Sequence, residues 1–249
     1  SRTTDTDTVL DADLDVARRT AIGYEGVRAV DCGPTNVFSP GTSGSEADVA
    51  ASLTELLKTC EGRVAVTTFA SNVARLESII RAADACGRHP VLVGRGMHRV
   101  TAAAREAGYL TDLPELVSEN NAGYLPRDKV LFVCTGSQGE PRAALARIAE
   151  DNHPHIVLEK GDTAIFSSRV IPGNETLIFD LQNLLATRGI RVITEKDHFV
   201  HVSGHPCRDE LAAMYQWIRP QVSVPVPGLS LLPLPEPTRL LSTSYARFC

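Results

Sequence analysis

Residues 63–75, RVAVTTFASNVAR, contain the pattern from which the fold can be inferred. Residues 63–67 are mostly apolar or β-branched and predict a buried strand, and residues 72–85 have the apolar spacing of a helix. A polar turn containing Thr68, Ser71 and Asn72 joins the two. A buried strand, a polar turn and a helix in succession form the repeating unit of a parallel α/β sheet.

The same unit recurs along the chain. Strands are predicted at residues 27–30, 63–67, 90–93, 130–134, 163–166 and 189–193, and helices at residues 46–59, 72–85, 97–107, 141–150, 175–188 and 208–218. Residues 31–36 are predicted to form a turn. Such alternation indicates an α/β fold, a parallel sheet with helices on both faces, which binds its ligand at the carboxyl ends of the strands.

Polar loops follow three of the predicted strands, at residues 68–72, 135–141 and 167–175. Each places hydroxyl, amide or guanidinium side chains before a helix, a geometry that suits phosphate binding. For any single loop, helix capping and turn formation are the commoner explanation. Their repetition favours a shared phosphate site, for which the candidate residues are Ser71, Asn72, Ser137, Gln138 and Arg169.

A further candidate is the loop HVSGH, residues 201–205. It places two imidazoles, a hydroxyl and a glycine just before the predicted helix at residues 208–218, and glycine lets the backbone approach a ligand. Histidine titrates near neutral pH and serves as acid, base or metal ligand. The alternative is that these histidines are only polar surface residues. His201, Ser203 and His205 are the candidate residues of this loop.

Composition narrows the class of protein. With 249 residues, of which 43% are hydrophobic and 22% charged, the chain has the composition of a typical globular protein. Its net charge of −5 requires that any polyanion contact comes from a local basic patch. The six cysteines form no C-x-x-C pair, which favours buried, reduced thiols. No apolar run is long enough to span a membrane, and the polar start is not a secretory signal, so we expect a cytoplasmic protein without a membrane partner.

Together, RVAVTTFASNVAR, TGSQGEP (135–141), IFSSRVIPGNE (165–175) and HVSGH resemble the ribonuclease J family. Those enzymes carry a β-CASP insertion in a metallo-β-lactamase domain. The resemblance implies RNA as partner, metal-dependent RNA hydrolysis in endonuclease and 5′-to-3′ exonuclease modes, and zinc as the family's cofactor. It also implies that His205 is catalytic, that His201 and Ser203 contact phosphate, and that Ser137 and Gln138 belong to an RNA-binding loop.

The resemblance also implies a division of the chain. Residues 1–44 and 199–228 would be fragments of the αββα metallo-β-lactamase domain, and residues 45–198 the β-CASP domain, with an irregular tail at residues 229–249. Left without their usual sheet, the lactamase fragments would expose apolar residues. We therefore expect frayed ends around a self-sufficient core, or a homo-oligomer that covers them.

The sequence departs from the family pattern at the metal-binding positions. No H-x-H-x-D-H motif occurs, and we expect its counterpart upstream of Ser1. The family's D-S-T-N is replaced by a segment that ends in Asn36, and the histidine of P-V-H-G is replaced by Pro227. Zinc needs several imidazole and carboxylate ligands, so we expect no tightly bound metal. A substitute site is less favoured; it would use Asp197, His198, His201 and His205.

Two functions remain open. The first is a ribonuclease J-like protein that is inactive alone or needs a complementing partner. The second is a non-catalytic RNA-binding or assembly module that pairs with an intact ribonuclease J. Several arginines are candidates for an RNA channel, although most are expected on solvated helix faces: Arg75, Arg81, Arg88, Arg95, Arg99, Arg127, Arg142 and Arg169. His153 and His155 are expected in a surface loop.

A third function, nucleotide binding by a doubly wound domain, is disfavoured. Neither G-x-G-x-x-G after the first strand nor G-x-x-x-x-G-K-[ST] occurs.

Overall fold

The computed structural model describes residues 29–32, 36, 38–218 and 222–225. They fall into two compact units, which we describe separately. One contains residues up to Ser45 together with those from Ser203 onward, and the other is Glu46–Val202. The boundaries lie at residues 45/46 and 202/203. The division into lactamase fragments and a β-CASP domain at 44/45 and 198/199 stays a prediction.

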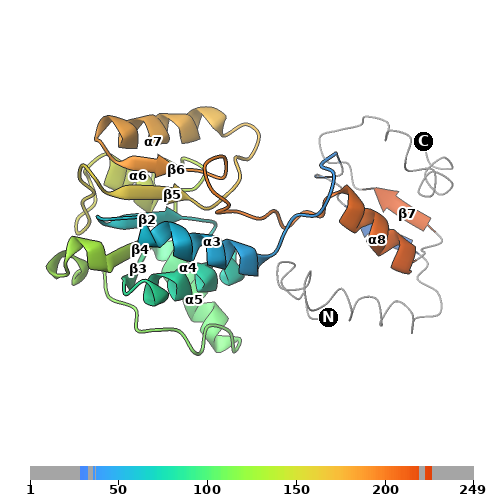
Figure 1. Ribbon diagram of the computed structural model, residues 1–249, viewed down its shortest axis with the longest axis horizontal. Helices are drawn as coiled ribbons and strands as arrows, with labels where there is room; N and C mark the ends of the chain where they lie inside the picture. The colour runs from blue at the N-terminus through green and yellow to red at the C-terminus, as the bar shows by residue number, and fades with distance from the viewer. Residues whose placement is uncertain (1–28, 33–35, 37, 219–221, 226–249) are drawn as a thin grey trace. The chain divides into compact units, whose positions relative to one another are not determined.

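Up to residue 218, strands and helices alternate in the order that the sequence predicts, and the strand at residues 222–225 was not predicted (Figure 1). They are β1 (Ala29–Cys32), α3 (Glu46–Lys58), β2 (Val64–Thr67), α4 (Val73–Ala85), β3 (His89–Val93), α5 (Arg95–Glu106), η1 (Ala122–Tyr124), η2 (Arg127–Lys129), β4 (Val130–Cys134), α6 (Ala144–Ala149), β5 (Thr163–Phe166), α7 (Glu175–Thr187), β6 (Arg191–Ile193), α8 (Arg208–Ile218) and β7 (Val222–Pro225).

The larger unit is built on a five-stranded parallel sheet with the order β3-β4-β2-β5-β6. Its register aligns the strand ends, because Thr67 at the end of β2 pairs with Cys134 of β4 and with Phe166 of β5. The loops that follow these strands therefore start at one edge of the sheet. The predicted parallel α/β fold and the common carboxyl edge are both confirmed.

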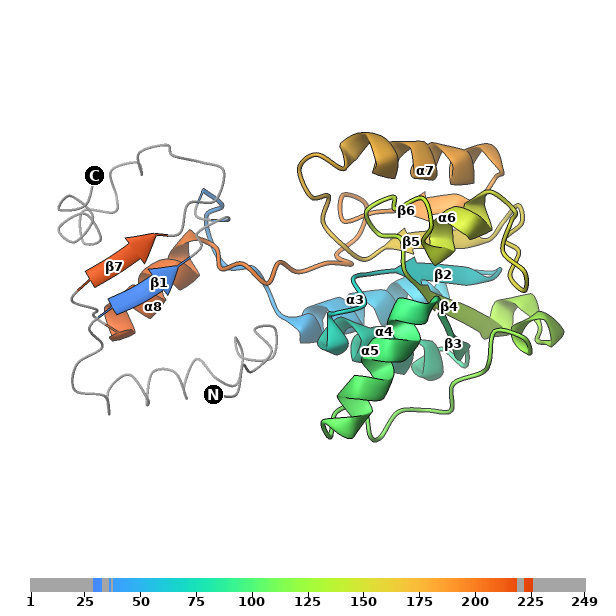
Figure 2. The ribbon, with the colours of Figure 1, turned by 180° about the vertical axis from the view of Figure 1, so that it is seen from behind.

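Helices cover both faces of this sheet (Figures 1 and 2). Side chains alternate along β2, so Val64 and Val66 join a core with α3, α4 and α5, while Ala65 joins a core with α6 and α7. The predicted apolar face of α3 is buried, with Val49 and Leu53 at most 1% exposed. Strands buried on both faces explain the continuous apolar runs in the sequence.

Several element boundaries differ from the prediction by one to three residues, and three of these differences have a cause in the contacts of the element. α5 begins two residues early, at Arg95, because Gly94 is its N-cap with φ 98°, a conformation that suits glycine. α6 begins at Ala144 instead of residue 141, where Thr135 accepts hydrogen bonds from the Ala144 and Leu145 amides. β1 continues through Cys32 because it pairs in parallel with β7, so Asp31 lies in a strand and not in a turn.

In the smaller unit, β1 and β7 form a two-stranded parallel sheet, and α8 has the bounds that the sequence predicted. Glu210 stabilises the first turn of α8. Its Oε2 accepts from the Cys207 amide at 2.7 Å and from the Ser43 hydroxyl at 2.6 Å. Within the part of the chain that the structure describes, none of the helices is both long and apolar enough to cross a bilayer.

Candidate functional site

The carboxyl edge of the larger sheet is organised around Arg75, whose side chain is fully buried. Its guanidinium donates to both carboxylate oxygens of Glu46, with Nε to Oε1 at 2.5 Å and Nη2 to Oε2 at 2.9 Å. Nη1 contacts the Ser167 hydroxyl at 2.9 Å and the Val200 carbonyl at 3.2 Å. A buried guanidinium that is paired in this way ties α3, α4, the end of β5 and the segment after β6 together.

The same Nη1 lies 3.2 Å from Nδ1 of His201. Because a guanidinium donates hydrogen bonds and accepts none, Nδ1 must offer its lone pair, and the ring hydrogen must be on Nε2. Burial, followed by the charges of Arg75 and Arg169, lowers the pKa of His201 to about 4. At neutral pH, His201 is therefore an uncharged imidazole whose Nε2–H is a hydrogen-bond donor.

Gln138 connects two of the edge loops. Its side-chain amide donates to the Arg169 carbonyl at 2.9 Å, and its oxygen accepts from the Ile171 amide at 3.0 Å and from Asn174 at 3.3 Å. With 4% of its surface exposed, Gln138 acts mainly by holding the loop after β4 against the loop after β5. Its direct contact with RNA stays a prediction.

The remaining candidates of this unit differ in exposure. Ser71 and Arg169 are exposed, whereas Ser137 is 2% exposed. Asn72 is the N-cap of α4, and its Oδ1 accepts from the Arg75 amide at 2.9 Å. Capping, which is the commoner explanation for such loops, thus accounts for Asn72. Arg169 and His201 are the two candidates at this edge that offer a charge or a ring hydrogen to a ligand.

In the smaller unit, Asn36 organises the HVSGH loop. Its amide donates to the Ser203 hydroxyl oxygen at 2.9 Å and to the His205 carbonyl at 3.1 Å. The His205 amide also donates to that oxygen, at 3.2 Å. Since the Ser203 oxygen accepts these two bonds, its own hydrogen is directed elsewhere. The His205 residue is exposed, and its catalytic role stays a prediction.

The described residues do not fit the zinc centre that the resemblance implies. Across residues 29–32, 36, 38–218 and 222–225, no group of three His, Cys, Asp or Glu side chains converges as metal ligands. The guanidinium of Arg75 occupies Nδ1 of His201 and repels a cation. Asp197, a member of the less favoured substitute site, accepts from the Thr194 amide at 2.8 Å and from the Thr194 hydroxyl at 2.9 Å.

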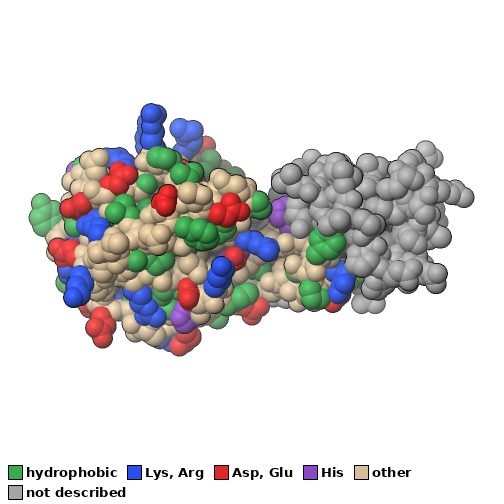
Figure 3. Space-filling model, turned by 90° about the horizontal axis from the view of Figure 1, so that it is seen from above, with side chains coloured by type: hydrophobic (Ala, Val, Ile, Leu, Met, Phe, Trp, Pro, Cys, Tyr) green, Lys and Arg blue, Asp and Glu red, His purple; other side chains and the backbone are tan. Residues whose placement is uncertain are grey.

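The positive charge at this edge comes from individual arginines and not from a basic surface as a whole. On the face in Figure 3, basic and acidic side chains are interspersed, as the net charge of −5 leads one to expect. Arg75 lies neither on a solvated helix face nor in a channel, the two positions that the sequence left open, because Glu46 neutralises it inside the protein. Arg169 keeps its expected position in an exposed loop at the strand end.

The sequence did not indicate the supporting roles of Glu46, Arg75 and Asn36. Glu46 and Arg75 are 29 positions apart, so no local pattern shows that they pair. Asn36 was named only as the last residue of the segment that replaces the D-S-T-N motif. Because the asparagine of that motif is present here, it could have indicated a role for Asn36. Each of these residues supports a candidate residue rather than replacing one.

The fold and the edge define a class: a parallel α/β domain whose strand-end loops are held together by hydrogen bonds. Comparison with known proteins makes the class specific. Residues 61–185 match the family described as "Ribonuclease J, beta-CASP domain". The chain belongs to the ribonuclease J family.

Curated relatives agree with this assignment. Ribonuclease J of Sinorhizobium meliloti is 50% identical over 214 residues, which are 86% of this chain and 38% of the relative. Ribonuclease J of Mycolicibacterium smegmatis is 42% identical over 215 residues, again 86% and 38%. Ribonuclease J2 of Bacillus subtilis is 36% identical over 220 residues, 88% of this chain and 40% of the relative. The chain thus spans about two fifths of the length of these relatives.

Proposed function

We propose that this protein binds the phosphate backbone of single-stranded RNA at the carboxyl edge of the five-stranded sheet. The exposed guanidinium of Arg169 supplies the charge, and His201 supplies a neutral Nε2–H donor. Arginine suits phosphate because its planar fork of donors matches the phosphate oxygens. Membership of the ribonuclease J family supports RNA as the source of that phosphate.

The observation that carries the proposal is the buried pair of Arg75 and Glu46, which orders His201. A buried ion pair is poor evidence for stability, because apolar residues of similar volume stabilise a core as well or better. Here the pair fixes the tautomer of a histidine beside an exposed arginine. Such preorganisation is typical of a site that binds a ligand.

In the smaller unit, Ser203 and His205 are proposed to contact phosphate as well. Asn36 fixes the Ser203 oxygen at 2.9 Å, which leaves the Ser203 hydrogen to donate to a ligand. If His205 takes part in hydrolysis, its role is to orient the phosphate or to protonate the leaving oxygen. No catalytic step through a metal is assigned to the described residues.

We also propose that the protein acts in the cytoplasm, with an intact ribonuclease J or a second copy of itself as partner. The cysteines that the structure describes with their side chains, namely Cys60, Cys86, Cys134 and Cys207, are free thiols, as is usual in a reducing compartment. Burial raises the pKa of the Cys134 thiol to about 12, so it remains protonated.

The test is a titration of the whole chain with a fluorescently labelled single-stranded RNA at several salt concentrations. We expect affinity to fall steeply with salt, because bound phosphates release counterions. Arg169→Gln should weaken binding and reduce the salt slope by about 1. Arg105→Gln is the matched control, since Arg105 is an exposed arginine in the last turn of α5. Absence of binding at low salt, or an equal loss in both variants, would refute the proposal.

A separate assay addresses hydrolysis. We expect the chain alone not to cut 5′-monophosphorylated RNA, because the described residues lack a converging set of metal ligands. Turnover by the purified chain that a chelator abolishes would show that the metal site is present after all. Binding without turnover favours the RNA-binding module.

A further inference from the structure

The same sheet edge contains a second polar feature, on the side of β3 and β4. It is a pocket of about 630 Å³, within the roughly 300–1,000 Å³ typical of sites for small molecules. Its walls come from the start of α5, the end of β4, the first turn of α6 and the segment around His153. It shares no residue with the RNA site proposed above, so either proposal can fail without the other.

The pocket is strongly basic. Arg95 and Arg99 line it from α5, and Arg142 and Arg147 line it from the loop before α6 and from α6 itself, whereas Glu119 is the acidic residue of its wall. These side chains give a charge of +3 even with the histidines neutral. In a chain whose net charge is −5, this concentration of arginine is not a consequence of composition. All four arginines are exposed residues, and Glu119 faces His98 and His153.

The floor of the pocket is the turn from β3 into α5. Gly94 has φ 98°, and an added Cβ there would lie 2.9 Å from the Thr135 hydroxyl oxygen. The turn thus requires glycine and keeps the backbone open toward the pocket. The Gly94 amide donates to Glu119 Oε1 at 3.2 Å. A carboxylate therefore already occupies a position where the first turn of α5 favours negative charge.

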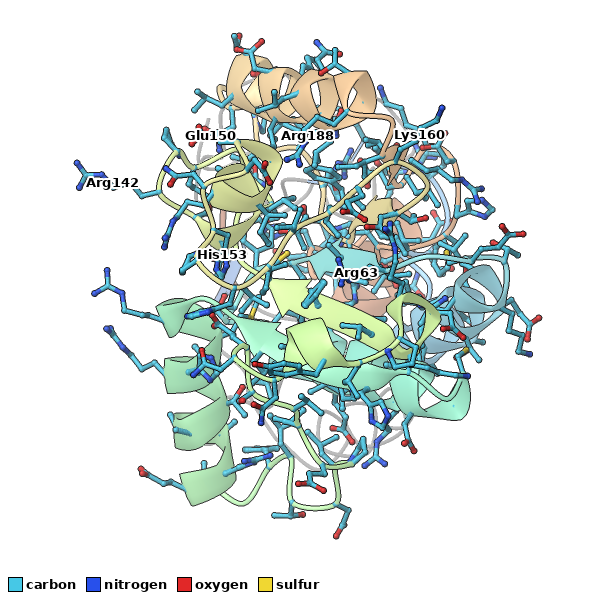
Figure 4. All side chains as sticks on the ribbon, turned by 90° about the vertical axis from the view of Figure 1, so that its left-hand side faces the viewer. Arg63, Arg142, Glu150, His153, Lys160 and Arg188 are labelled. Atoms are coloured by element: carbon cyan, nitrogen blue, oxygen red, sulfur yellow. The ribbon has the colours of Figure 1, made fainter. Side chains whose placement is uncertain are left out.

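Glu119 is also held by two histidines. His98 Nε2 lies 3.3 Å from its Oε1, and His153 Nε2 lies 3.8 Å from its Oε2. His153 lies in the loop between α6 and β5, as expected, but its side chain is only 4% exposed. Figure 4 shows Arg142 extending from the protein beside α6, while His153 lies against the protein body.

We propose that this pocket binds a phosphorylated nucleotide, with its phosphate groups between the arginines of α5 and those around α6. The negative charge of a diphosphate would compensate the net positive charge of the side chains that line the pocket. Arginine binds phosphate oxygens through paired donors, and the Gly94 amide becomes available when the Glu119 carboxylate moves aside. The nucleotide is either free or part of an RNA strand, since both offer the same phosphate chemistry.

The test is isothermal titration calorimetry of the whole chain with inorganic pyrophosphate and with adenosine 5′-diphosphate. Arg142→Gln combined with Arg147→Gln should weaken binding of both probes at least tenfold. Glu119→Gln should tighten it several-fold, since it removes the competing charge, and a folding defect cannot produce that change. Arg105→Gln, on the far end of α5, should leave the affinity within twofold of the parent.

The proposal is overturned if neither probe binds at millimolar concentration, or if the double variant and Arg105→Gln behave alike. It is also overturned if Glu119→Gln weakens binding. Competition identifies the source of the phosphate. A single-stranded RNA that displaces the diphosphate places an RNA nucleotide in the pocket, and failure of RNA to displace it indicates a free nucleotide.

Discussion

The two sides of the carboxyl edge use arginine in opposite ways. Between β2 and β6, Arg75 is fully buried, and Glu46 and backbone oxygens neutralise it. Around β3 and β4, Arg95 and Arg142 are exposed and line a pocket. The first arrangement orders other groups, and the second is available to a ligand. Residue type alone therefore does not tell a positioning arginine from a binding arginine; the partner and the burial do.

The largest effect is expected from breaking the buried pair. Arg75→Leu or Glu46→Leu alone should lower the free energy of unfolding by about 3–5 kcal/mol, because each leaves an uncompensated buried charge. The double variant should recover most of that loss. Urea denaturation of the three proteins measures both quantities.

The same helix provides the matched control. Arg81 and Glu77 form an exposed pair on α4 at 2.8 Å, and Arg81→Leu should cost below about 1 kcal/mol. Equal losses for Arg75→Leu and Arg81→Leu would mean that the Arg75 pair is not buried.

The next largest loss of stability is expected from a substitution in the loop after β4. Gly139 has φ 73°, and a Cβ there would lie 2.5 Å from the Leu177 carbonyl carbon of α7. Gly139→Ala should destabilise the protein by about 3 kcal/mol, from left-handed strain and overpacking together. Thermal or urea unfolding gives the value.

Gly161 separates the two contributions. It has φ 91°, but a Cβ there meets nothing within 4 Å, so Gly161→Ala should show only the strain of about 1–2 kcal/mol. If Gly139→Ala costs no more than Gly161→Ala, the loop is not packed on α7 as described.

A smaller effect is the contribution of His201 to the pH dependence of the free energy of unfolding. Its pKa is about 4 in the folded protein and about 6.5 when unfolded. Above pH 6.5 both states are neutral, and the group contributes no pH dependence. As the pH falls from 6.5 to 4, only the unfolded state gains the proton, so stability falls by up to about 3 kcal/mol.

His201→Asn should remove this part of the acid destabilisation. The free energy of unfolding of both proteins, measured between pH 7 and pH 4, gives the difference between the two slopes. Identical slopes would show that His201 titrates normally. His155→Asn is a control, because His155 is an exposed histidine.

The sequence predicted the fold well, because burial on both faces gives each strand a continuous apolar run. β4, β5 and α8 have the predicted bounds. The errors at the start of α5 and α6 arose where tertiary contacts decide the first turn, as when Thr135 binds the amides that open α6. Local propensity contains no information on such contacts.

The candidate site was predicted less completely. The sequence indicated Arg169 and the HVSGH loop, because polar residues at strand ends follow a general rule of α/β folds. It did not reveal that Glu46 neutralises Arg75, or that the side chain of His153 lines a pocket. The pocket is assembled from segments between residues 94 and 155, and no short motif spans that distance.

Burial and the Arg75 guanidinium keep His201 neutral, with its hydrogen on Nε2. Nitrogen-15 NMR of the histidine rings, with His201 assigned from the spectrum of His201→Asn, measures this directly. We expect Nδ1 to be unprotonated at neutral pH and the pKa of His201 to be about 4. A ring hydrogen on Nδ1, or titration near the ordinary pKa of about 6.5, would contradict it.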